Sequence, residues 1–151
     1  MWPFSTKPKP KAQRSRITGE TCSMLLQALF RGRTLPNFKL FMQKQTLTCP
    51  TTADVEQASQ RAFMPWCQDV WECEDIARAF VHECQRTAAN EGCSWAVGTL
   101  RANSPLGTPN EMHVFAWCIV EDSHGARAAK IYDPTACQWC NIPSGIDYAL
   151  S

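Results

Sequence analysis

The sequence predicts one α+β domain in which a central helix packs on a small antiparallel sheet. The chain has 151 residues and is 44% hydrophobic, which is enough for one core and too short for two independent domains. Residues 71–92 carry apolar side chains at helical spacing. Three shorter apolar runs after them have the composition of strands.

The first 18 residues are expected to form a flexible basic tail. Prolines and basic residues alternate between positions 3 and 18, and no acidic residue occurs there. Such a segment cannot bury enough apolar surface to fold. The folded domain is therefore expected to span residues 19–151.

The first half of this domain is predicted to contain two short helices with an extended segment between them. Residues 21–30 have helical spacing and follow a possible cap at Thr18 or Thr21. Residues 37–50 alternate loosely and are expected to be extended, and residues 37–48 are expected to border the substrate groove. A second helix begins at a Thr52 cap and ends near Met64, because the residue before a proline is disfavoured in a helix.

The central helix is predicted over residues 71–92. Its apolar positions follow the 3.6-residue period, and Gly92 supplies a helix stop. Cys73 lies at its N-terminal end, followed by two acidic residues that suit the positive end of the helix dipole.

The sheet is predicted from the runs 93–100, 113–120 and 128–133. The last two flank a turn-forming cluster centred on residue 123, so they form a hairpin. Positions 113 and 133 are equally far from residue 123, which sets His113 and Asp133 opposite each other. Opposed Cβ atoms lie about 4.5–5.5 Å apart, within reach of a hydrogen bond between the two side chains.

These three residues predict a nucleophilic thiol site. A thiol attacks only as its thiolate, and a helix N-terminus together with an imidazolium lowers its pKa. Cys73 is the expected nucleophile, His113 carries the proton, and Asp133 orients the imidazole.

Three motifs resemble the transglutaminase-like and papain-like cysteine peptidase superfamily, in its order of nucleophile, histidine and acid. They are Cys73-Glu-Asp-Ile-Ala, His113-Val-Phe-Ala-Trp and Tyr132-Asp-Pro-Thr, and they span about half of the chain. The resemblance implies a papain-like fold and activities that include proteolysis, amide hydrolysis, deamidation and amide crosslinking. The opening Trp71-Glu-Cys-Glu-Asp also looks like the thiol-protease domain of some fungal agglutinins.

The sequence departs from the family in two places. Val114 follows the histidine where the family often has alanine, and no upstream segment clearly supplies an oxyanion donor. Gln68 is the candidate donor through its side-chain amide, and the indole N–H of Trp66 is the alternative.

The expected function is a cysteine hydrolase, a thiol protease or amidohydrolase acting on peptide or side-chain amides, with no cofactor. Transglutaminase or deamidase activity, and a catalytically inactive papain-like binding module, are the alternatives. Cys137 and Cys140 have C-x-x-C spacing, which also leaves open a metal-binding structural protein, although no metal is expected.

The resemblance implies a peptide or protein substrate, and composition gives no reason to add nucleic acid as a partner. The 15 basic and 14 acidic residues nearly cancel, which removes the charge argument for nucleic acid. No signal peptide or membrane-spanning run is visible, and a cytoplasmic protein is expected. Nine cysteines leave at least one thiol unpaired, and the oligomeric state stays open.

Overall fold

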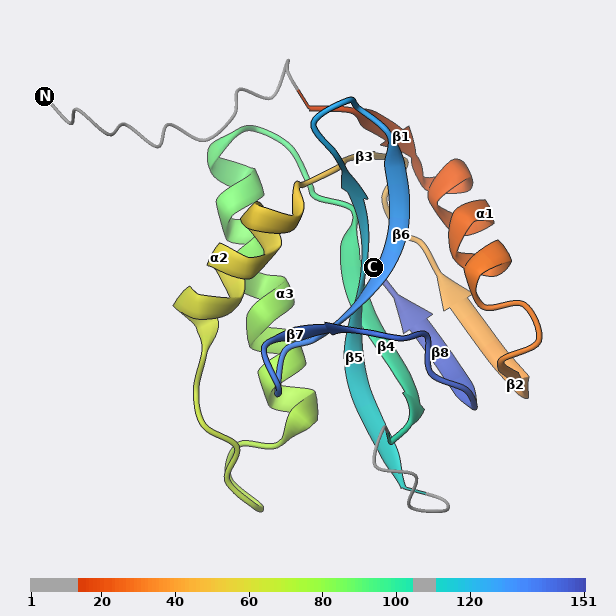
Figure 1. The fold of residues 1–151 in the computed structure, drawn as a ribbon, viewed down its shortest axis with the longest axis vertical. Helices are drawn as coiled ribbons and strands as arrows, with labels where there is room; N and C mark the ends of the chain where they lie inside the picture. Colours follow the sequence, from red (N-terminus) through yellow and green to blue (C-terminus); the bar gives the residue numbers. More distant parts are fainter. Residues whose placement is uncertain (1–13, 105–110) are drawn as a thin grey trace, which may run out of the picture.

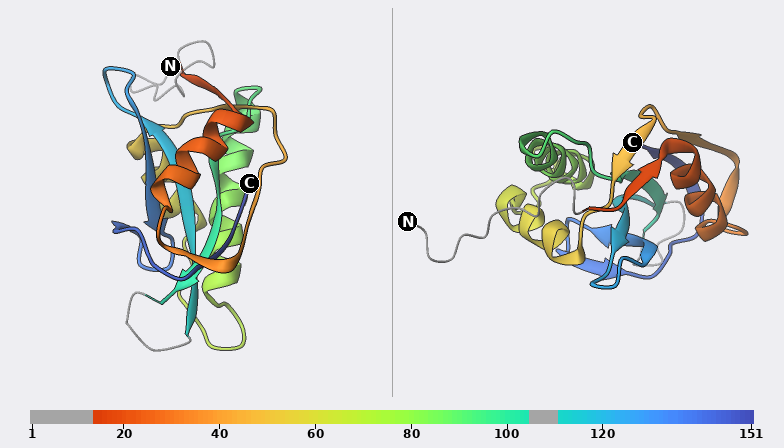
Figure 2. Two further views of the ribbon diagram at one scale, coloured as in Figure 1. Left: turned by 90° about the vertical axis from the view of Figure 1, so that its right-hand side faces the viewer. Right: turned by 90° about the horizontal axis from the view of Figure 1, so that it is seen from above.

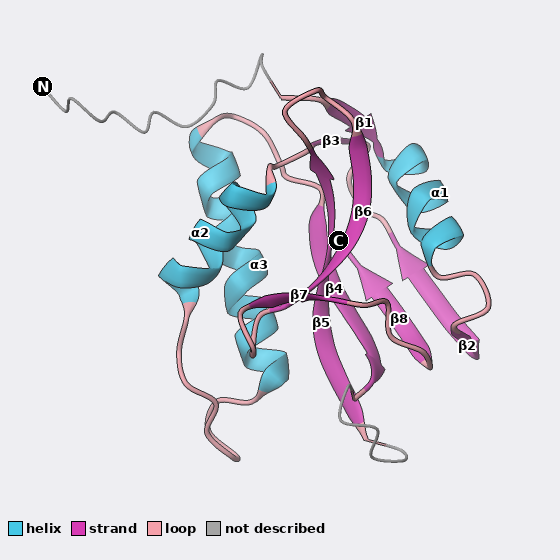
Figure 3. Cartoon of the chain, in the orientation of Figure 1, coloured by secondary structure: helices cyan, strands magenta, loops and turns pink. Residues whose placement is uncertain are grey.

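The computed structural model describes residues 14–104 and 111–151, and Figures 1 and 3 show how their elements are arranged. In chain order the elements are β1 (Arg16–Thr18), α1 (Gly19–Leu29), β2 (Thr34–Phe41), β3 (Thr46–Thr48), α2 (Thr52–Ala62), α3 (Cys73–Asn90), β4 (Val97–Asn103), β5 (Met112–Glu121), β6 (Arg127–Asp133), β7 (Gln138–Cys140) and β8 (Ile146–Leu150).

Six strands form one mixed sheet in the order β2-β8-β4-β5-β6-β7. β2 and β8 are parallel, whereas the other neighbouring pairs are antiparallel. β1 and β3 form a separate two-stranded sheet. Helix α1 covers one face of the large sheet, and α2 and α3 lie together on the other (Figure 2).

The predicted fold class is therefore wrong. A papain-like core with one central helix on a small antiparallel sheet was expected, whereas the sheet has six strands, is mixed, and carries helices on both faces. The difference comes mainly from the parallel pair, in which Thr34 is aligned with Ile146. Local periodicity contains no information about a pairing between segments so far apart in the chain.

The alternation of side chains along β5 divides the core in two. Phe115, Trp117 and Ile119 belong to the cluster under α1. Ala116, Cys118 and Val120 belong to the cluster under α2 and α3. This strand is buried on both faces, and so holds the two helical layers in a fixed relation.

The three predicted helices are confirmed. The side chain of Thr18 caps α1 by accepting from the N–H of Thr21. Helix α2 is capped by Thr51 rather than Thr52. Past the end of α3, Gly92 has a φ of 71°, which favours glycine. No helix among the described residues is long and apolar enough to cross a membrane.

Part of the expected tail belongs to the fold. Residues 1–13 lie outside the described residues, but 16–18 form β1. The Arg14 side chain is fully buried and forms ion pairs with Asp54 at 2.5 Å and Glu91 at 2.7 Å. Its guanidinium also lies 5.1 Å from the ring centre of Trp95.

Candidate functional site

Cys73 is the first residue of α3 and is half-buried. The N–H of the preceding Glu72 donates to the carboxylate of Asp75 at 3.1 Å, which fixes the start of the helix. A helix N-terminus presents unpaired N–H groups and the positive end of the dipole. Both features favour a negative charge on the sulfur.

His113 and Asp133 are joined by a hydrogen bond. Imidazole Nε2 lies 2.9 Å from Oδ1 of Asp133, the last residue of β6. The predicted register is nevertheless wrong, because β5 and β6 align Ala116 with Tyr132, and the same spacing would set Phe115 opposite Asp133. A shift of two residues keeps both side chains on the same face, and a diagonal neighbour is still within reach.

Cys73 meets His113 from the other side of the imidazole. Because Nε2 faces Asp133, the remaining nitrogen, Nδ1, is the one left to share a hydrogen bond with the sulfur. That hydrogen bond lowers the pKa of the Cys73 thiol below its ordinary value, although burial acts against it. The backbone N–H groups of Val114 and Glu74 also donate to the sulfur and lower its pKa further.

The pKa of His113 is shifted in the opposite direction. Burial alone would lower it, but the hydrogen bonds with Asp133 and Cys73 and the charges of both groups outweigh burial and raise the pKa to about 9. A lowered thiol pKa beside a raised imidazole pKa favours a thiolate–imidazolium pair. The arrangement can therefore attack an electrophile and return a proton.

The turn after β6 holds the carboxylate of Asp133 in place. Its Oδ1 accepts from the N–H groups of Thr135 at 3.1 Å and Ala136 at 3.4 Å, in addition to the imidazole. Both contacts are local and follow from an aspartate that starts a turn. The same turn that ends the strand thus orients the acid.

Gln68 and Trp66 both lie in the loop that leads into α3, and both are exposed. This loop closes on itself, since the N–H groups of Val70 and Trp71 donate to the carbonyl of Cys67. Trp66 is 53% exposed, so its indole can meet a ligand from solvent. The loop places the two predicted donors upstream of Cys73 without hydrogen-bonding either of them to its sulfur.

Sequence reasoning missed the two backbone donors to the sulfur. The N–H of Glu74 was within reach of prediction, because the first N–H groups of any helix lack intrahelical partners. The N–H of Val114 was not, because its contact depends on how α3 packs against β5.

Cys137 and Cys140 do not form a disulfide, and all nine cysteines are free. Burial raises the pKa of the Cys140 thiol to about 11. Cys137 is exposed in the turn after β6 and has a φ of 53°. Among residues 14–104 and 111–151, no group of three or more histidine, cysteine or acidic side chains could hold a metal ion.

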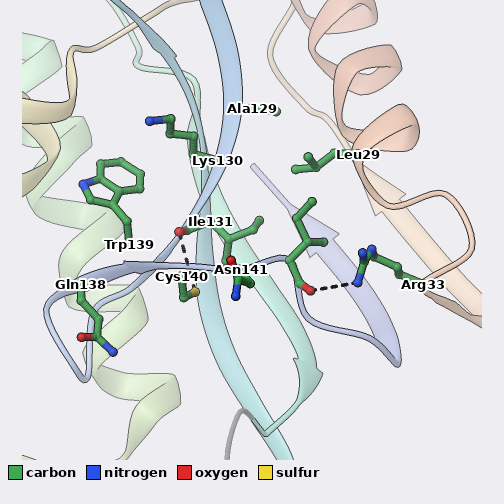
Figure 4. A pocket seen from close by; sticks show the side chains of 10 residues that line it. Leu29, Arg33, Ala129, Lys130, Ile131, Gln138, Trp139, Cys140 and Asn141 are labelled. Atoms are coloured by element: carbon green, nitrogen blue, oxygen red, sulfur yellow. Dashed lines mark hydrogen bonds between the residues drawn. The ribbon is translucent and has the colours of Figure 1, made fainter.

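A separate cavity of about 910 Å³ opens beside α1, β6 and β7 (Figure 4). Its lining includes Arg33, Lys130, Trp139 and Asn141, and none of the three residues of the thiol site. The ammonium of Lys130 lies 5.7 Å from the ring centre of Trp139. Arg33 is held at the rim by donating to the carbonyl of Ile142 at 3.1 Å.

Comparison with known proteins gives matches only at the level of structure. The sequence matches no protein-family model and no curated protein sequence. A structure of PSL1a in complex with E64 matches with a TM-score of 0.70 and 17% identity, over 90% of this chain and 51% of that one. The Polyporus squamosus lectin, bound to the human-type influenza-binding epitope Neu5Aca2-6Galb1-4GlcNAc, matches with a TM-score of 0.69 and 16% identity, over 90% of this chain and 49% of that one. The chain therefore shares a fold with about half the length of these proteins.

These matches correct the family identification. The chain was identified with transglutaminase-like and papain-like cysteine peptidases, but the fold matches a lectin. The prediction of a cysteine hydrolase, with its protease and transglutaminase variants, is corrected together with the family from which it was inferred.

Proposed function

We propose that this chain is a ligand-binding module whose binding site is an activated thiol, formed by Cys73, His113 and Asp133. The observation that carries the proposal is the position of the His113 imidazole, hydrogen-bonded to Asp133 at 2.9 Å and to the sulfur of Cys73. An activated thiol of this kind is useful to a binding module whose ligand carries an electrophilic atom.

The proposed chemistry is capture of an electrophile such as an epoxide. The thiolate of Cys73 forms a bond to one epoxide carbon, and the bond from that carbon to oxygen breaks. The resulting alkoxide takes the proton of the His113 imidazolium, which leaves a thioether and a neutral imidazole. The complex of the neighbour PSL1a with E64 supports this class of ligand, since the two proteins share a fold.

Gln68 is proposed to steady the oxygen of the bound ligand, with Trp66 as the alternative. Both residues are exposed in the loop that precedes Cys73, and an amide or an indole N–H donates to a developing negative charge.

The test is covalent capture of E64, whose epoxide alkylates thiols. We expect one adduct per chain on Cys73, no adduct in Cys73→Ser, and a strongly slowed reaction in His113→Ala. Cys67 and Cys137 are the internal controls, because both are exposed and neither belongs to the site. An adduct spread over all three cysteines would refute the proposal. Steady release of product from a peptide amide, abolished in Cys73→Ser, would contradict a role confined to binding.

Glycan binding is the second candidate, supported by the lectin among the structural neighbours. The cavity of Figure 4 has suitable chemistry, because the charge of Arg33 suits a sugar carboxylate and the amide of Asn141 can hydrogen-bond sugar hydroxyls. The carboxylate of Neu5Ac in the trisaccharide bound by that lectin is such a group.

Titration of the trisaccharide into the protein, followed by NMR, tests this candidate. We expect shifts around Trp139 that disappear in Arg33→Ala but persist in Arg31→Ala, an exposed arginine outside the cavity. An unchanged spectrum of the wild-type chain would reject the cavity as a glycan site.

A cytoplasmic location is proposed from the state of the cysteines. All nine are free, as expected of a protein in a reducing compartment. When cells are lysed in the presence of a thiol-blocking reagent, we expect nine blocked thiols per chain. A smaller number would indicate disulfides and an oxidising compartment.

A further inference from the structure

The face of the sheet that α3 covers is left open over β8 and β2. Helix α3 packs on β4 and β5. Along β8, Ala149 belongs to the core under α1, so its neighbours Tyr148 and Leu150 point to the α3 side. Phe41 is 49% exposed and Leu150 is 38% exposed. Within residues 14–104 and 111–151, an aromatic and aliphatic surface is therefore uncovered beside the helix.

Two adjoining hollows lie along this surface. One, of about 380 Å³, is bounded by Val81 of α3, Thr99 of β4, and Tyr148 and Leu150 of β8. The other, of about 450 Å³, shares Tyr148 and Leu150 and extends to Phe41 of β2. Together they form a groove of the size that takes part of a small organic or peptide ligand.

The first hollow lies beside the thiol site. Glu74 and Val114 line the first hollow, and the backbone N–H groups of the same two residues donate to Cys73. A ligand held at the sulfur can thus reach the first hollow past Glu74 and Val114.

The charged side chains Glu74 and Arg78 of the first hollow are paired within the protein, whereas Lys39 lines the second hollow. Arg78 forms an ion pair with Glu74, and Arg101 forms one with Asp147 at 3.4 Å. The floor between these pairs is made by Val81, Tyr148 and Leu150. Such a surface favours an uncharged apolar group over a charged group or a sugar, whose hydroxyls would lose their hydrogen bonds to water.

We infer that this groove is the specificity subsite of the thiol, and that it takes an apolar side chain of an extended, peptide-like ligand whose electrophilic atom meets Cys73. The inference rests on the proposed function. It adds the class of ligand that the site selects, and the groove rather than the sulfur makes the selection.

Alkylation rates with three probes of one chemical type test the inference. Chloroacetamide measures the sulfur alone, N-chloroacetyl-leucinamide adds an apolar side chain, and N-chloroacetyl-aspartamide adds an acidic one. Rates with glutathione correct for intrinsic reactivity. We expect the corrected leucine probe to label Cys73 about tenfold faster than chloroacetamide, since burial of a leucine side chain supplies at least that factor.

Thr99→Phe fills the first hollow, and should bring the ratio of the leucine rate to the chloroacetamide rate close to one. Thr34→Phe, at the opposite end of β2, is the matched control and should keep the wild-type ratio. Val81→Phe fills the same hollow from α3 and replaces Thr99→Phe if that variant does not fold.

The outcomes separate this inference from the proposed function. A reactive Cys73 that shows no preference among the probes, or prefers the aspartate probe, overturns the subsite and leaves the thiol site intact. A Cys73 that every probe labels no faster than Cys67 overturns the thiol site and the subsite together.

Discussion

Two opposite pKa shifts at neighbouring residues define the range of pH in which the site is charged. The hydrogen bond from His113 lowers the pKa of Cys73, and the partners of His113 raise its own pKa to about 9. Between these two values the sulfur is negative and the imidazole is positive. Above the upper value the ring no longer has a proton to give.

Alkylation of Cys73 should therefore depend on pH in a way that differs between reagents. Iodoacetamide needs only the thiolate, so we expect it to label Cys73 at a lower pH than a free thiol and to stay effective at high pH. E64 opening consumes a proton and should slow as the pH rises through about 9. In His113→Ala, labelling by iodoacetamide at neutral pH should fall, because loss of the hydrogen bond from His113 raises the thiol pKa.

Peptide mass spectrometry with limiting reagent measures these profiles. The exposed Cys67 and Cys137 supply the comparison in the same sample. Identical profiles for all three thiols would mean that His113 does not activate Cys73.

Replacement of Asp133 by asparagine should lower the pKa of His113 from about 9 toward the ~6.5 of a free imidazole, because it removes the charged acceptor. A raised histidine pKa also stabilises the folded chain at low pH, and that contribution is lost as the pH rises through about 9. Asp133→Asn should reduce this stabilisation of the folded chain at low pH.

NMR titration of the His113 ring reads the pKa directly. Asp122→Asn, in the turn between β5 and β6, is the matched control and should leave it in place. An unaltered His113 titration in Asp133→Asn would assign the shift to Cys73 alone.

Cys73, His113 and Asp133 are in contact as the sequence predicted, but the predicted alignment of β5 and β6 was wrong. His113 and Asp133 were predicted from a turn centred on residue 123, whereas Glu121 pairs with Arg127. The carboxylate of Asp122 accepts from the N–H groups of His124 and Ala126, which stabilises a longer turn. That local hydrogen bonding shifts the register, and the spacing of apolar residues does not reveal it.

At the scale of elements, helices were easier to predict than strands. The period of α3 is visible over its whole length, and Gly92 marks its end. In contrast, β1 and β7 have three residues each, too few to show alternation. β8 was also missed, because its partners β2 and β4 are distant in the chain.

Two neighbouring threonines lie at the start of α2, and Thr51 is the one that caps the helix. The Thr51 hydroxyl accepts from the N–H of Asp54 at 3.1 Å, and the Asp54 carboxylate accepts from the N–H of Thr51 at 2.8 Å. Thr51→Ala should cost about 1 kcal/mol of unfolding free energy, as loss of an N-cap usually does. Thr52→Ala, at the first helical position, should change it by less.

Urea denaturation of both variants measures the difference. A larger loss of unfolding free energy in Thr52→Ala than in Thr51→Ala would support the cap at Thr52 that the sequence predicted.

At the scale of the whole molecule, Arg14 ties the N-terminal segment to both helices of one layer. Its partners are Asp54 in the first turn of α2 and Glu91 at the end of α3, and the Glu91 side chain is only 3% exposed. The three groups stabilise one another because their charges are matched inside the protein.

Arg14→Ala should therefore destabilise the fold by about 3–5 kcal/mol, since it leaves Glu91 buried without its partner. Arg14→Ala combined with Glu91→Gln should recover part of that loss. Arg16→Ala is the control, because Arg16 is exposed on β1. Equal urea midpoints for Arg14→Ala and Arg16→Ala would mean that the ion pairs of Arg14 do not stabilise the fold.

The place of β8 in the sheet has a consequence for synthesis on the ribosome. Among the strands of the described residues, β2 pairs only with β8, and β8 lies between β2 and β4. A nascent chain that has emerged as far as β7 thus holds β2 without its neighbour, and its large sheet ends at β4. Because contacts between distant segments form late, vectorial folding should stop at this stage until residues 146–150 are released. During that pause the open edges of β2 and β4 are where a chaperone, or a second nascent chain, would pair.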